Sequence, residues 1–393
     1  MSIKYDFETI ANKMPGSLKD LMTPDFLKEK GVVSFAAGEL DFATAPSLNK
    51  ALIDLASNGL YGFTLRNDEY LNAVTWWMKE VRNANVKNEE IVTTLGTIYS
   101  LATTIKAFSN EKDAIIVQSP YYSRYKQAAD RLNRRTVYNN LIEEGNRYSI
   151  DFEDLEAKMQ DPRNKILVLN NPLNPSGNVF TIEELRKVSE LSNKYKVVVF
   201  CDEIFADIVL DNEKIIPYIY VNENDKYGIS CTSLGKAFNL TGVNHANVLI
   251  KDENLRERFT LQRTNDHYGS IDPTAQAMVL GAYSKEGLDW LIEMSKHIKE
   301  NSNIVHKTIE EYFPECKIFE NKAAFVAWLD FSNLSKNNEE LENYLLNKCL
   351  FHVDMSDEYG GKQGQFRMSL GSTRNQIIEA MERLRKGFGR WLH

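Results

Sequence analysis

Residues 196–203 read Lys196-Val197-Val198-Val199-Phe200-Cys201-Asp202-Glu203, an apolar run that ends in two acids. A short, continuous apolar run of this kind is typical of a strand that is buried on both faces of a parallel sheet. Three more runs have the same character, and polar residues or prolines follow each of them: 114–118, 165–169 and 227–230. We therefore expect a sheet of buried strands.

Amphipathic segments separate these strands. Thr181-Ile182-Glu183-Glu184 matches a helix capping box, and Leu185, Val188 and Leu191 follow it on one helical face. Strand–helix–strand units imply a mostly parallel sheet with right-handed crossovers, and ligands bind such sheets at the carboxyl ends of the strands. From about Lys285 the pattern changes to a long helical stretch and an apparent strand at 324–329, which predicts a second, smaller α+β domain.

Composition restricts the class of protein. A length of 393 residues favours roughly two domains. The net charge of −8 argues against a surface for nucleic acid or an anionic membrane, since both need basic patches. No apolar run approaches the ~18–20 residues of a membrane span, and residues 1–8 lack the apolar core of a signal peptide. The cysteines lie far apart and the histidines lack metal-ligand spacing, so we expect a cytoplasmic protein without disulfides or a metal site.

Two glycine-containing turns could bind a ligand. Thr94-Leu95-Gly96-Thr97-Ile98 opens a predicted helix, where free N–H groups and the helix dipole suit a phosphate, although most such turns are plain caps. Asn171-Pro172-Leu173-Asn174-Pro175-Ser176-Gly177 follows a buried strand. Its two Asn-Pro steps make a rigid loop, which either directs the Asn174 amide toward a ligand or serves as a structural turn.

Two charged residues also follow predicted strands. Asp202 ends one of them, so its carboxyl must be paired or neutralised; a helix cap, a buried ion pair or the cationic nitrogen of a heterocycle would each do this. Lys236 closes Ser233-Leu234-Gly235-Lys236 after another strand. Most lysines are solvated, but a desolvated lysine has a lowered pKa and can form an imine.

In their order along the chain, these features resemble the pyridoxal-phosphate (PLP) enzymes of fold type I, aminotransferase classes I and II. The family's series of a Gly turn, P-x-Y, NPxNPxG, D-x-x-[YH], SxxK and a late Arg runs over nearly the whole chain, and Ala37-Gly38-Glu39-Leu40-Asp41-Phe42 resembles the family's AGxxDF signature. Four stretches resemble the bacterial cystathionine β-lyase-like branch of carbon–sulfur lyases: 41–46, 67–69, 236–239 and 327–330.

The resemblance implies the α/β fold of aspartate aminotransferase. A large PLP domain with a mostly parallel sheet would span residues 46–285, and a smaller α+β domain would span residues 286–393. An N-terminal segment, 1–45, would pack with the small domain. The resemblance also implies a homodimer with shared active sites, because Tyr61, or Phe63 at the adjacent family position, would reach the phosphate in a partner subunit.

The resemblance further implies a role for each residue of the site. Lys236 would hold PLP as a Schiff base and then act as the base at the substrate Cα. Asp202 would keep the pyridine nitrogen protonated, and Tyr122, two residues after Pro120, would stack on the ring. Asn174 would hydrogen-bond the ring oxygen. The phosphate would be bound by Gly96, Thr97, Ile98 and Ser233. Arg367, with Gly38 and Asn174, would bind the substrate carboxylate.

This sequence departs from the family's pattern at several positions. Phe205 stands where the family has Tyr or His, so the ring oxygen would lose a donor and the imine pKa should rise. Asn244, beside His245, replaces an Arg that often helps to bind phosphate, and Phe63 replaces the usual Tyr. The loop before Arg367 reads Val353-Asp354-Met355-Ser356, without the branch's usual Pro-Gly.

The expected function is that of a PLP-dependent carbon–sulfur β-lyase, which acts on an L-amino acid through an external aldimine and releases a 2-oxo acid and ammonia. An aminotransferase would use the same residues and is the alternative. Phe205 also keeps a PLP-dependent amino-acid oxidase open, because some oxygen-using enzymes of this fold carry Phe there. A non-catalytic PLP-binding regulator is a further hypothesis, against which the presence of Lys236, Asp202 and Arg367 argues.

Overall fold

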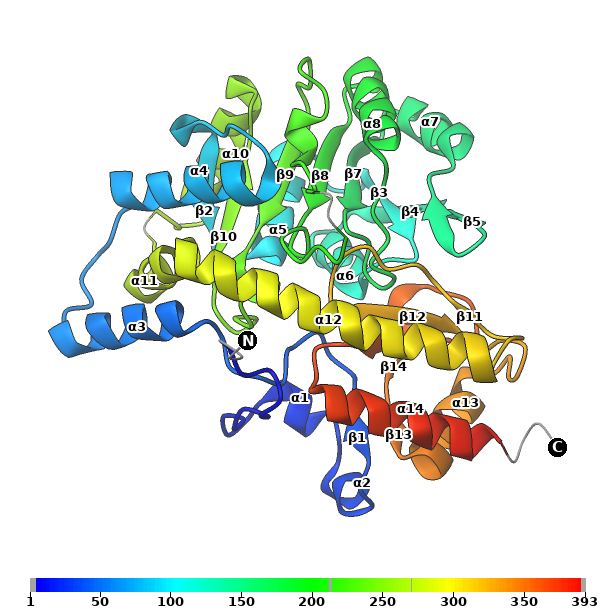
Figure 1. Cartoon of the computed structure of the whole chain (residues 1–393). Coiled ribbons are helices and arrows are strands. Elements are labelled where there is room, and N and C mark those ends of the chain that lie inside the picture. The colour runs from blue at the N-terminus through cyan, green and yellow to red at the C-terminus, as the bar shows by residue number, and fades with distance from the viewer. Residues whose placement is uncertain (1–4, 212–213, 270, 390–393) are drawn as a thin grey trace.

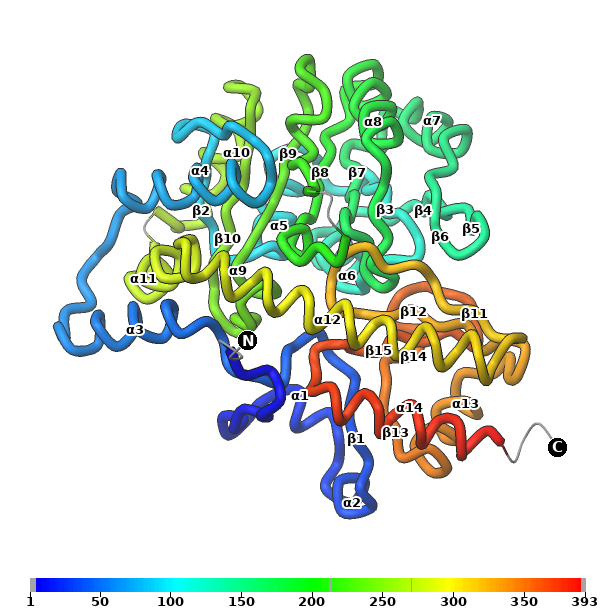
Figure 2. Tube along the Cα trace, in the orientation of Figure 1, coloured from blue at the N-terminus to red at the C-terminus, as the bar shows by residue number. Residues whose placement is uncertain are grey.

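The computed structural model describes residues 5–211, 214–269 and 271–389, and all structural statements below concern these residues. Residues 1–4, where the absence of a signal sequence was expected, and His393, one of the histidines considered above, lie outside them. The chain forms two main sheets joined by a long helix, α12 (Lys285–Tyr312). Near its beginning α12 contacts α3 (Pro46–Asn58) and α11 (Pro273–Ala282), and farther along it contacts α14 (Arg374–Phe388) and β11 (Lys317–Ile318) (Figures 1 and 2).

The larger sheet has seven strands in the order β2-β10-β9-β8-β7-β3-β4. Their bounds are β2 Ile91–Thr94, β3 Ala114–Ser119, β4 Arg135–Asn140, β7 Asn164–Asn170, β8 Val198–Asp202, β9 Gly228–Thr232 and β10 Ala246–Leu249. Strands β9, β8, β7, β3 and β4 pair in parallel, and β10 runs antiparallel to both of its neighbours. The predicted mostly parallel sheet is confirmed.

Helices cover both faces of this sheet, which is why its strands read as continuous apolar runs. Along β8, Val198 and Phe200 pack into one core with α5 (Thr97–Phe108), α6 (Ser123–Arg131) and α10 (Glu253–Asn265). Val199 and Cys201 face the other core, which includes α4 (Asp68–Arg82), α7 (Phe152–Gln160) and α8 (Ile182–Tyr195) (Figure 1). The capping box predicted at Thr181 is present, since its side chain accepts from the Glu184 amide.

The smaller sheet is antiparallel, with the order β11-β12-β15-β14. Its strands are β11 Lys317–Ile318, β12 Val326–Asp330, β14 Asp354–Met355 and β15 Gln365–Ser369. The strand expected at 324–329 begins two residues later, at Val326, because Ala324 has a φ of 69°, in the left-handed region, and cannot continue a strand. Helix α13 (Asn338–Tyr344) and the π-helical turn η3 (Leu345–Cys349) precede β13 (Phe351–His352).

The N-terminal segment joins the C-terminal part of the chain. Strand β1 (Val33–Ser34) pairs in parallel with β13, and the short helices α1 (Leu18–Leu21) and α2 (Asp25–Glu29) precede it. This pairing is compatible with the expected packing of residues 1–45, whose boundaries remain a prediction. Strands β5 (Ile142–Glu144) and β6 (Arg147–Ser149) form a separate hairpin beyond β4.

The register of the large sheet brings the predicted strand-end residues together. Asn170 of β7 lies opposite Asp202 of β8, and Asp202 lies opposite Cys231 of β9. The loop 171–177, residues 203–205 and the short helix α9 (Leu234–Ala237) therefore all start at one edge of the sheet. This edge is where open α/β sheets bind their ligands.

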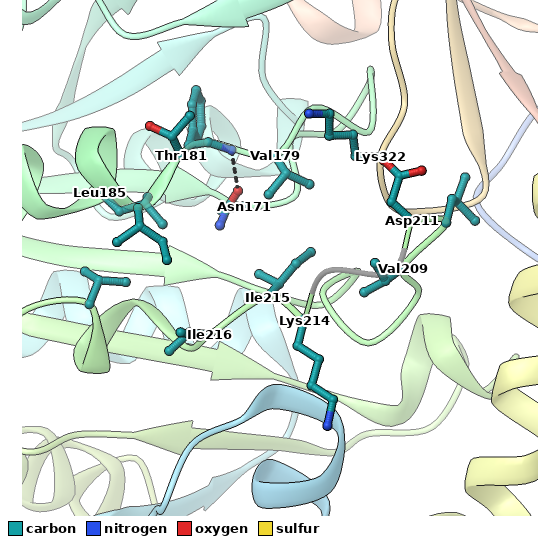
Figure 3. A pocket seen from close by; sticks show the side chains of 14 residues that line it. Asn171, Val179, Thr181, Leu185, Val209, Asp211, Lys214, Ile215, Ile216 and Lys322 are labelled. Atoms are coloured by element: carbon teal, nitrogen blue, oxygen red, sulfur yellow. Dashed lines mark hydrogen bonds between the residues drawn. The ribbon is translucent and has the colours of Figure 1, made fainter.

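A cavity of about 550 Å³ lies elsewhere, between the start of α8 and the segments 209–211 and 214–216 (Figure 3). Apolar side chains such as Val179, Leu185 and Ile215 line it, with Lys214 and Lys322 among the polar ones. None of its lining residues belongs to the predicted site. Among the described residues, no helix has the length and apolar character needed to cross a membrane, and no cluster of three or more His, Cys, Asp or Glu residues could hold a metal ion.

Candidate active site

Lys236 brings its amine to the carboxyl edge of the large sheet. Ser233 caps α9 by accepting from the Gly235 amide at 3.2 Å, and this short helix directs the Lys236 side chain toward the N-terminal segment. There Lys236 Nζ donates to the Gly38 carbonyl at 2.5 Å. Burial of the amine, and secondarily the positive charge of Arg367, lower the Lys236 pKa to about 8. A substantial fraction of the amine is therefore neutral, and so nucleophilic, slightly above neutral pH.

Asp202 ends β8 with a carboxyl that is 3% exposed. It accepts from the Tyr125 hydroxyl at 2.8 Å and from the Ile204 amide at 3.1 Å. Burial raises the pKa of Asp202 to about 6, although both hydrogen bonds act in the opposite direction. Within the described residues no cation lies within ion-pair distance of this carboxyl, so it is a buried acid with the capacity to hold a cationic group.

The glycine turn after β2 forms the beginning of α5. Gly96 is the N-cap, with a φ of 136° that residues with a Cβ rarely adopt. Thr97 and Ile98 occupy the first helical positions, where amide N–H groups have no partner within the helix and favour an anion. Thr94 pairs with Ala246 across the sheet, and Ser233 Oγ donates to the neighbouring His245 carbonyl at 2.6 Å. The turn and Ser233 thus belong to the same edge.

Arg367 enters this edge from β15 of the smaller sheet and is 5% exposed. Its Nη1 donates to Asn174 Oδ1 at 2.9 Å, so the loop 171–177 and the small sheet meet at this contact. Asn174 is itself held by its amide, which donates to Asn170 Oδ1 at 2.8 Å. The remaining amide nitrogen of the Asn174 side chain can donate to a ligand.

Aromatic side chains line the space between these charged groups. Tyr122 is the N-cap residue of α6 and lies edge-on to Tyr125, the partner of Asp202, with ring centroids 5.7 Å apart. Phe205 is 2% exposed, and its ring centroid lies 5.7 Å from Lys236 Nζ. Because Phe205 also packs edge-to-face with Phe325, its side chain joins the core of the small sheet to the site.

Three further positions singled out by the sequence differ in their surroundings. Tyr61 and Phe63 are exposed, at 58% and 104%, in the segment between α3 and α4, and do not join the group around Lys236. Asn244 is also exposed. Its neighbour His245 is buried, contacts the Tyr70 hydroxyl at 2.8 Å through Nε2, and has a pKa lowered by burial to about 4. His245 is therefore neutral at physiological pH.

Two residues of the site were not identified from the sequence. Tyr125 follows Tyr122 by three positions, which is helical spacing, and this was a signal that it could face the same edge. Asp354 pairs with Arg367 at 2.6 Å and is 8% exposed. Its only sequence signal was its place in the loop that departs from the family's pattern, because the pairing depends on the register of β14 against β15.

The residues present fit PLP on the chemistry of their donor groups. A partly buried lysine can bond to an aldehyde carbon, and a buried acid that has no cation within ion-pair distance in the described part of the chain can pair with a pyridinium nitrogen. The uncapped helix start at Gly96 suits a phosphate. These three groups lie on successive loops at one edge, which is the arrangement that a single phosphorylated heterocycle requires.

A comparison with known families identifies the chain. The model of aminotransferase classes I and II matches residues 30–384. The chain belongs to the class I and II aminotransferases. The resemblance noted in the sequence, the aspartate-aminotransferase-like fold and the PLP cofactor are thereby confirmed, and this aminotransferase-family protein is a PLP-dependent enzyme.

The relatives of this class I and II aminotransferase include both lyases and transferases. Cystathionine β-lyase PatB of Bacillus subtilis strain 168 is 29% identical over 349 residues, 88% of this chain and 90% of PatB. Aspartate aminotransferase of Pyrococcus horikoshii is 25% identical over 364 residues, 91% of each chain. Among solved structures, cystalysin from Treponema denticola, which contains a pyridoxal 5′-phosphate cofactor, superposes with a TM-score of 0.92 at 27% identity, covering 98% of this chain and 99% of cystalysin.

Proposed function

We propose that this enzyme is a carbon–sulfur β-lyase: with water, an L-amino acid bearing sulfur at Cβ yields a thiol, a 2-oxo acid and ammonia. The observation that carries the proposal is the Lys236 amine, which is partly buried, has a pKa of about 8 and, among the described residues, donates to the Gly38 backbone carbonyl. Such an amine can take a proton from Cα at neutral pH. The similarity to PatB, a cystathionine β-lyase with 29% identity to this chain, supports elimination over transfer.

Each step of this reaction uses groups of this chain. PLP, when bound, supplies an electron sink for the pair left on Cα. Lys236 accepts the Cα proton, and Asp202 keeps a positive charge at the ring nitrogen by pairing with it. Arg367 holds the substrate carboxylate, so that the Cα–H bond is presented to Lys236 in a fixed orientation. The sulfur then leaves from Cβ as a thiol.

Further residues are assigned to cofactor binding in the same proposal. The amides of Thr97 and Ile98 after Gly96 bind the phosphate, and Ser233 joins them when its hydroxyl turns away from the His245 carbonyl to which it donates in this structure. Tyr122 stacks on the ring. The side-chain nitrogen of Asn174 donates to the ring oxygen, and its side-chain oxygen accepts from Arg367. Asn174 thus holds the ring and Arg367 in a fixed position relative to each other. Phe205 donates no hydrogen bond to that oxygen, so Asn174 is its main donor.

We also propose a homodimer in which the exposed segment between α3 and α4 covers a partner's phosphate site. Several large apolar side chains are exposed there, among them Leu60, Tyr61, Phe63 and Leu65. An exposed group of this kind is unusual for a monomer and favours an interface. Sedimentation at micromolar concentration tests the dimer, and loss of phosphate affinity in Tyr61→Ala tests the shared site.

An assay of the purified holoenzyme tests the reaction. L-Cystathionine without any 2-oxo acid should yield the oxo acid and ammonia in equal amounts, and the Lys236→Ala variant should yield neither. The alternative is an aminotransferase, which similarity to aspartate aminotransferase of P. horikoshii keeps open. Product that forms only when 2-oxoglutarate is added would refute the lyase and favour transfer.

A further inference from the structure

The guanidinium of Arg367 is already engaged by an acid of the same chain. Asp354 Oδ2 accepts from both Arg367 Nε, at 3.2 Å, and Nη2, at 2.6 Å. The two residues lie directly opposite each other in the register of β14 and β15, and both are buried. Tyr359 packs on the pair, with its ring centroid 4.8 Å from the Arg367 carbon Cζ.

Asp354 is itself firmly held. The Ala37 amide donates to its Oδ2 at 3.2 Å, and the Tyr359 hydroxyl donates to the same oxygen at 3.3 Å. Ala37 directly precedes Gly38, whose carbonyl accepts from Lys236. The N-terminal segment thus fixes the carboxylate next to the Lys236 amine. A substrate that displaced it would break its hydrogen bonds with three residues, Ala37, Tyr359 and Arg367.

These contacts leave one edge of the guanidinium for a ligand. A guanidinium has five N–H groups in one plane. Asp354 takes Nε–H and one hydrogen of Nη2, while Asn174 takes one hydrogen of Nη1. One N–H group therefore remains on each Nη nitrogen, and these two groups can donate to a carboxylate.

The charge around Lys236 is acidic on balance. Among the described residues, the charged groups with the largest effect on the Lys236 pKa are one cation, Arg367, and three acids, Glu39, Asp202 and Asp354. Asp202 is committed to the ring nitrogen in the proposed function. Because Asp354 offsets the positive charge of Arg367, the site attracts the first carboxylate of a substrate only weakly. It has no further positive charge, among the described residues around Lys236, to compensate a second one.

We infer that Asp354 is a specificity-determining residue, which makes the site discriminate against amino acids whose side chain carries a net negative charge, such as aspartate, in favour of side chains without net charge, such as that of asparagine or the zwitterionic arm of cystathionine. Asp354 offsets the positive charge of Arg367 and occupies its Nε–H group. The α-carboxylate of the substrate then binds to the Nη1 and Nη2 groups, and an uncompensated carboxylate on the side chain is repelled by Asp354. The inference rests on the proposed function, in which Arg367 receives the substrate carboxylate.

Aspartate and asparagine provide the test in the unmodified holoenzyme, because they have nearly the same shape and differ in one charge. Neither has sulfur at Cβ, so binding is followed through the absorbance of the bound cofactor. Asparagine should bind at least about tenfold more tightly than aspartate, as expected for like charges at close range in a partly buried site. Equal binding, or tighter binding of aspartate, would overturn the inference without any variant.

The Asp354→Asn variant removes the charge and keeps the shape. In this variant the preference for asparagine should fall to about threefold or less, whereas Asp354→Glu should retain it. Asp161→Asn, which removes a surface acid at the opposite edge of the large sheet, is the control for net charge and should keep the wild-type ratio. If both affinities fall in Asp354→Asn but their ratio stays constant, Asp354 only positions Arg367 and the inference is wrong.

The failure of the proposed function would look different. In that case the holoenzyme would show the cofactor spectrum but no change with asparagine, aspartate or cystathionine, and the inference would fall with it. A response to asparagine and cystathionine together with an unselective response to aspartate would overturn the inference alone.

Discussion

Replacing Tyr125 by Phe should shift the pH range in which the protein binds its cofactor. The Tyr125 hydroxyl donates to Asp202 Oδ2 at 2.8 Å and lowers the Asp202 pKa, which burial raises to about 6. The substitution removes only this oxygen, while the Ile204 amide still donates to Asp202 Oδ1 at 3.1 Å. The carboxyl therefore stays buried but loses one of its two donors.

The magnitude follows from the charge on the acceptor. A hydrogen bond to an ionised group contributes about 1.5–3 kcal/mol, which corresponds to roughly 1–2 pKa units. The Asp202 pKa should rise from about 6 to roughly 7–8. At pH 7 the ionised fraction would fall from about 90% to roughly 10–50%, and only the ionised form pairs with a pyridinium nitrogen.

Titration of the apoprotein with PLP between pH 5.5 and 9 measures this shift. The affinity should rise with pH and level off near pH 6 in the wild type but near pH 7–8 in Tyr125→Phe. The titrations of PLP itself are common to both proteins and cancel in the ratio of the two affinities. Tyr195→Phe, which removes a 2.8 Å hydroxyl–carboxylate bond to Glu156 on the outer helices, should match the wild type. A ratio for Tyr125→Phe that does not change with pH would refute the reasoning.

Three further predictions concern the amine, its neighbour and the support of the site. Burial lowers the Lys236 pKa to about 8. The rate at which the apoprotein binds PLP covalently should therefore increase as the pH rises from 7 and become constant above pH 8. Stopped-flow rates that keep rising toward pH 10 would contradict this. In Gly38→Ala the new Cβ would lie 2.8 Å from Lys236 Nζ, so the amine must move and kcat/KM should fall at least about tenfold. Because only the end of a flexible side chain has to move, Tm should change by less than about 2 °C. An unchanged kcat/KM would contradict the contact between Gly38 and the amine. Arg82→Met leaves Glu203 and Asp207 buried without their cation. The free energy of unfolding should fall by about 3–5 kcal/mol, which thermal unfolding would show as a Tm decrease of at least about 5 °C. A smaller decrease would show that other groups compensate the two acids.

The strands of the large sheet could be predicted because burial on both faces leaves a direct trace in the sequence. Val198 and Phe200 belong to one core and Val199 and Cys201 to the other, so each position in the run had to be apolar. The run expected at 227–230 was displaced, since β9 extends from Gly228 to Thr232. Its buried Ser230 hydroxyl donates to the buried acid Glu203 at 2.8 Å, and this pairing cannot be seen without the fold.

The candidate site was predictable to the extent that its groups follow strands. Asp202 and Lys236 were found because each comes directly after a buried run, and parallel strands end at one edge. Phosphate binding at the Gly96 turn was suggested by the predicted helix start as well as by the family's pattern, whereas stacking by Tyr122 came from the pattern alone; both remain predictions. The short strand β10 was not predicted, since four residues between polar loops do not form a distinctive run.

The state of Arg367 could not be derived from its own motif, and this limit has a physical cause. A motif around β15 records which residue points inward, but the charge of the site depends on what lies opposite, and that is decided by the register with β14. A shift of one residue would point the Asp354 carboxyl to the other face and leave Arg367 with its full charge. The turn at 356–364 fixes the register, and its Gly364 has a φ of 86° with the backbone of Ser332 and Ser335 packed against it, so a side chain there would force the turn to move. The proposed substrate preference therefore depends on a glycine turn between β14 and β15 as well as on Arg367 itself.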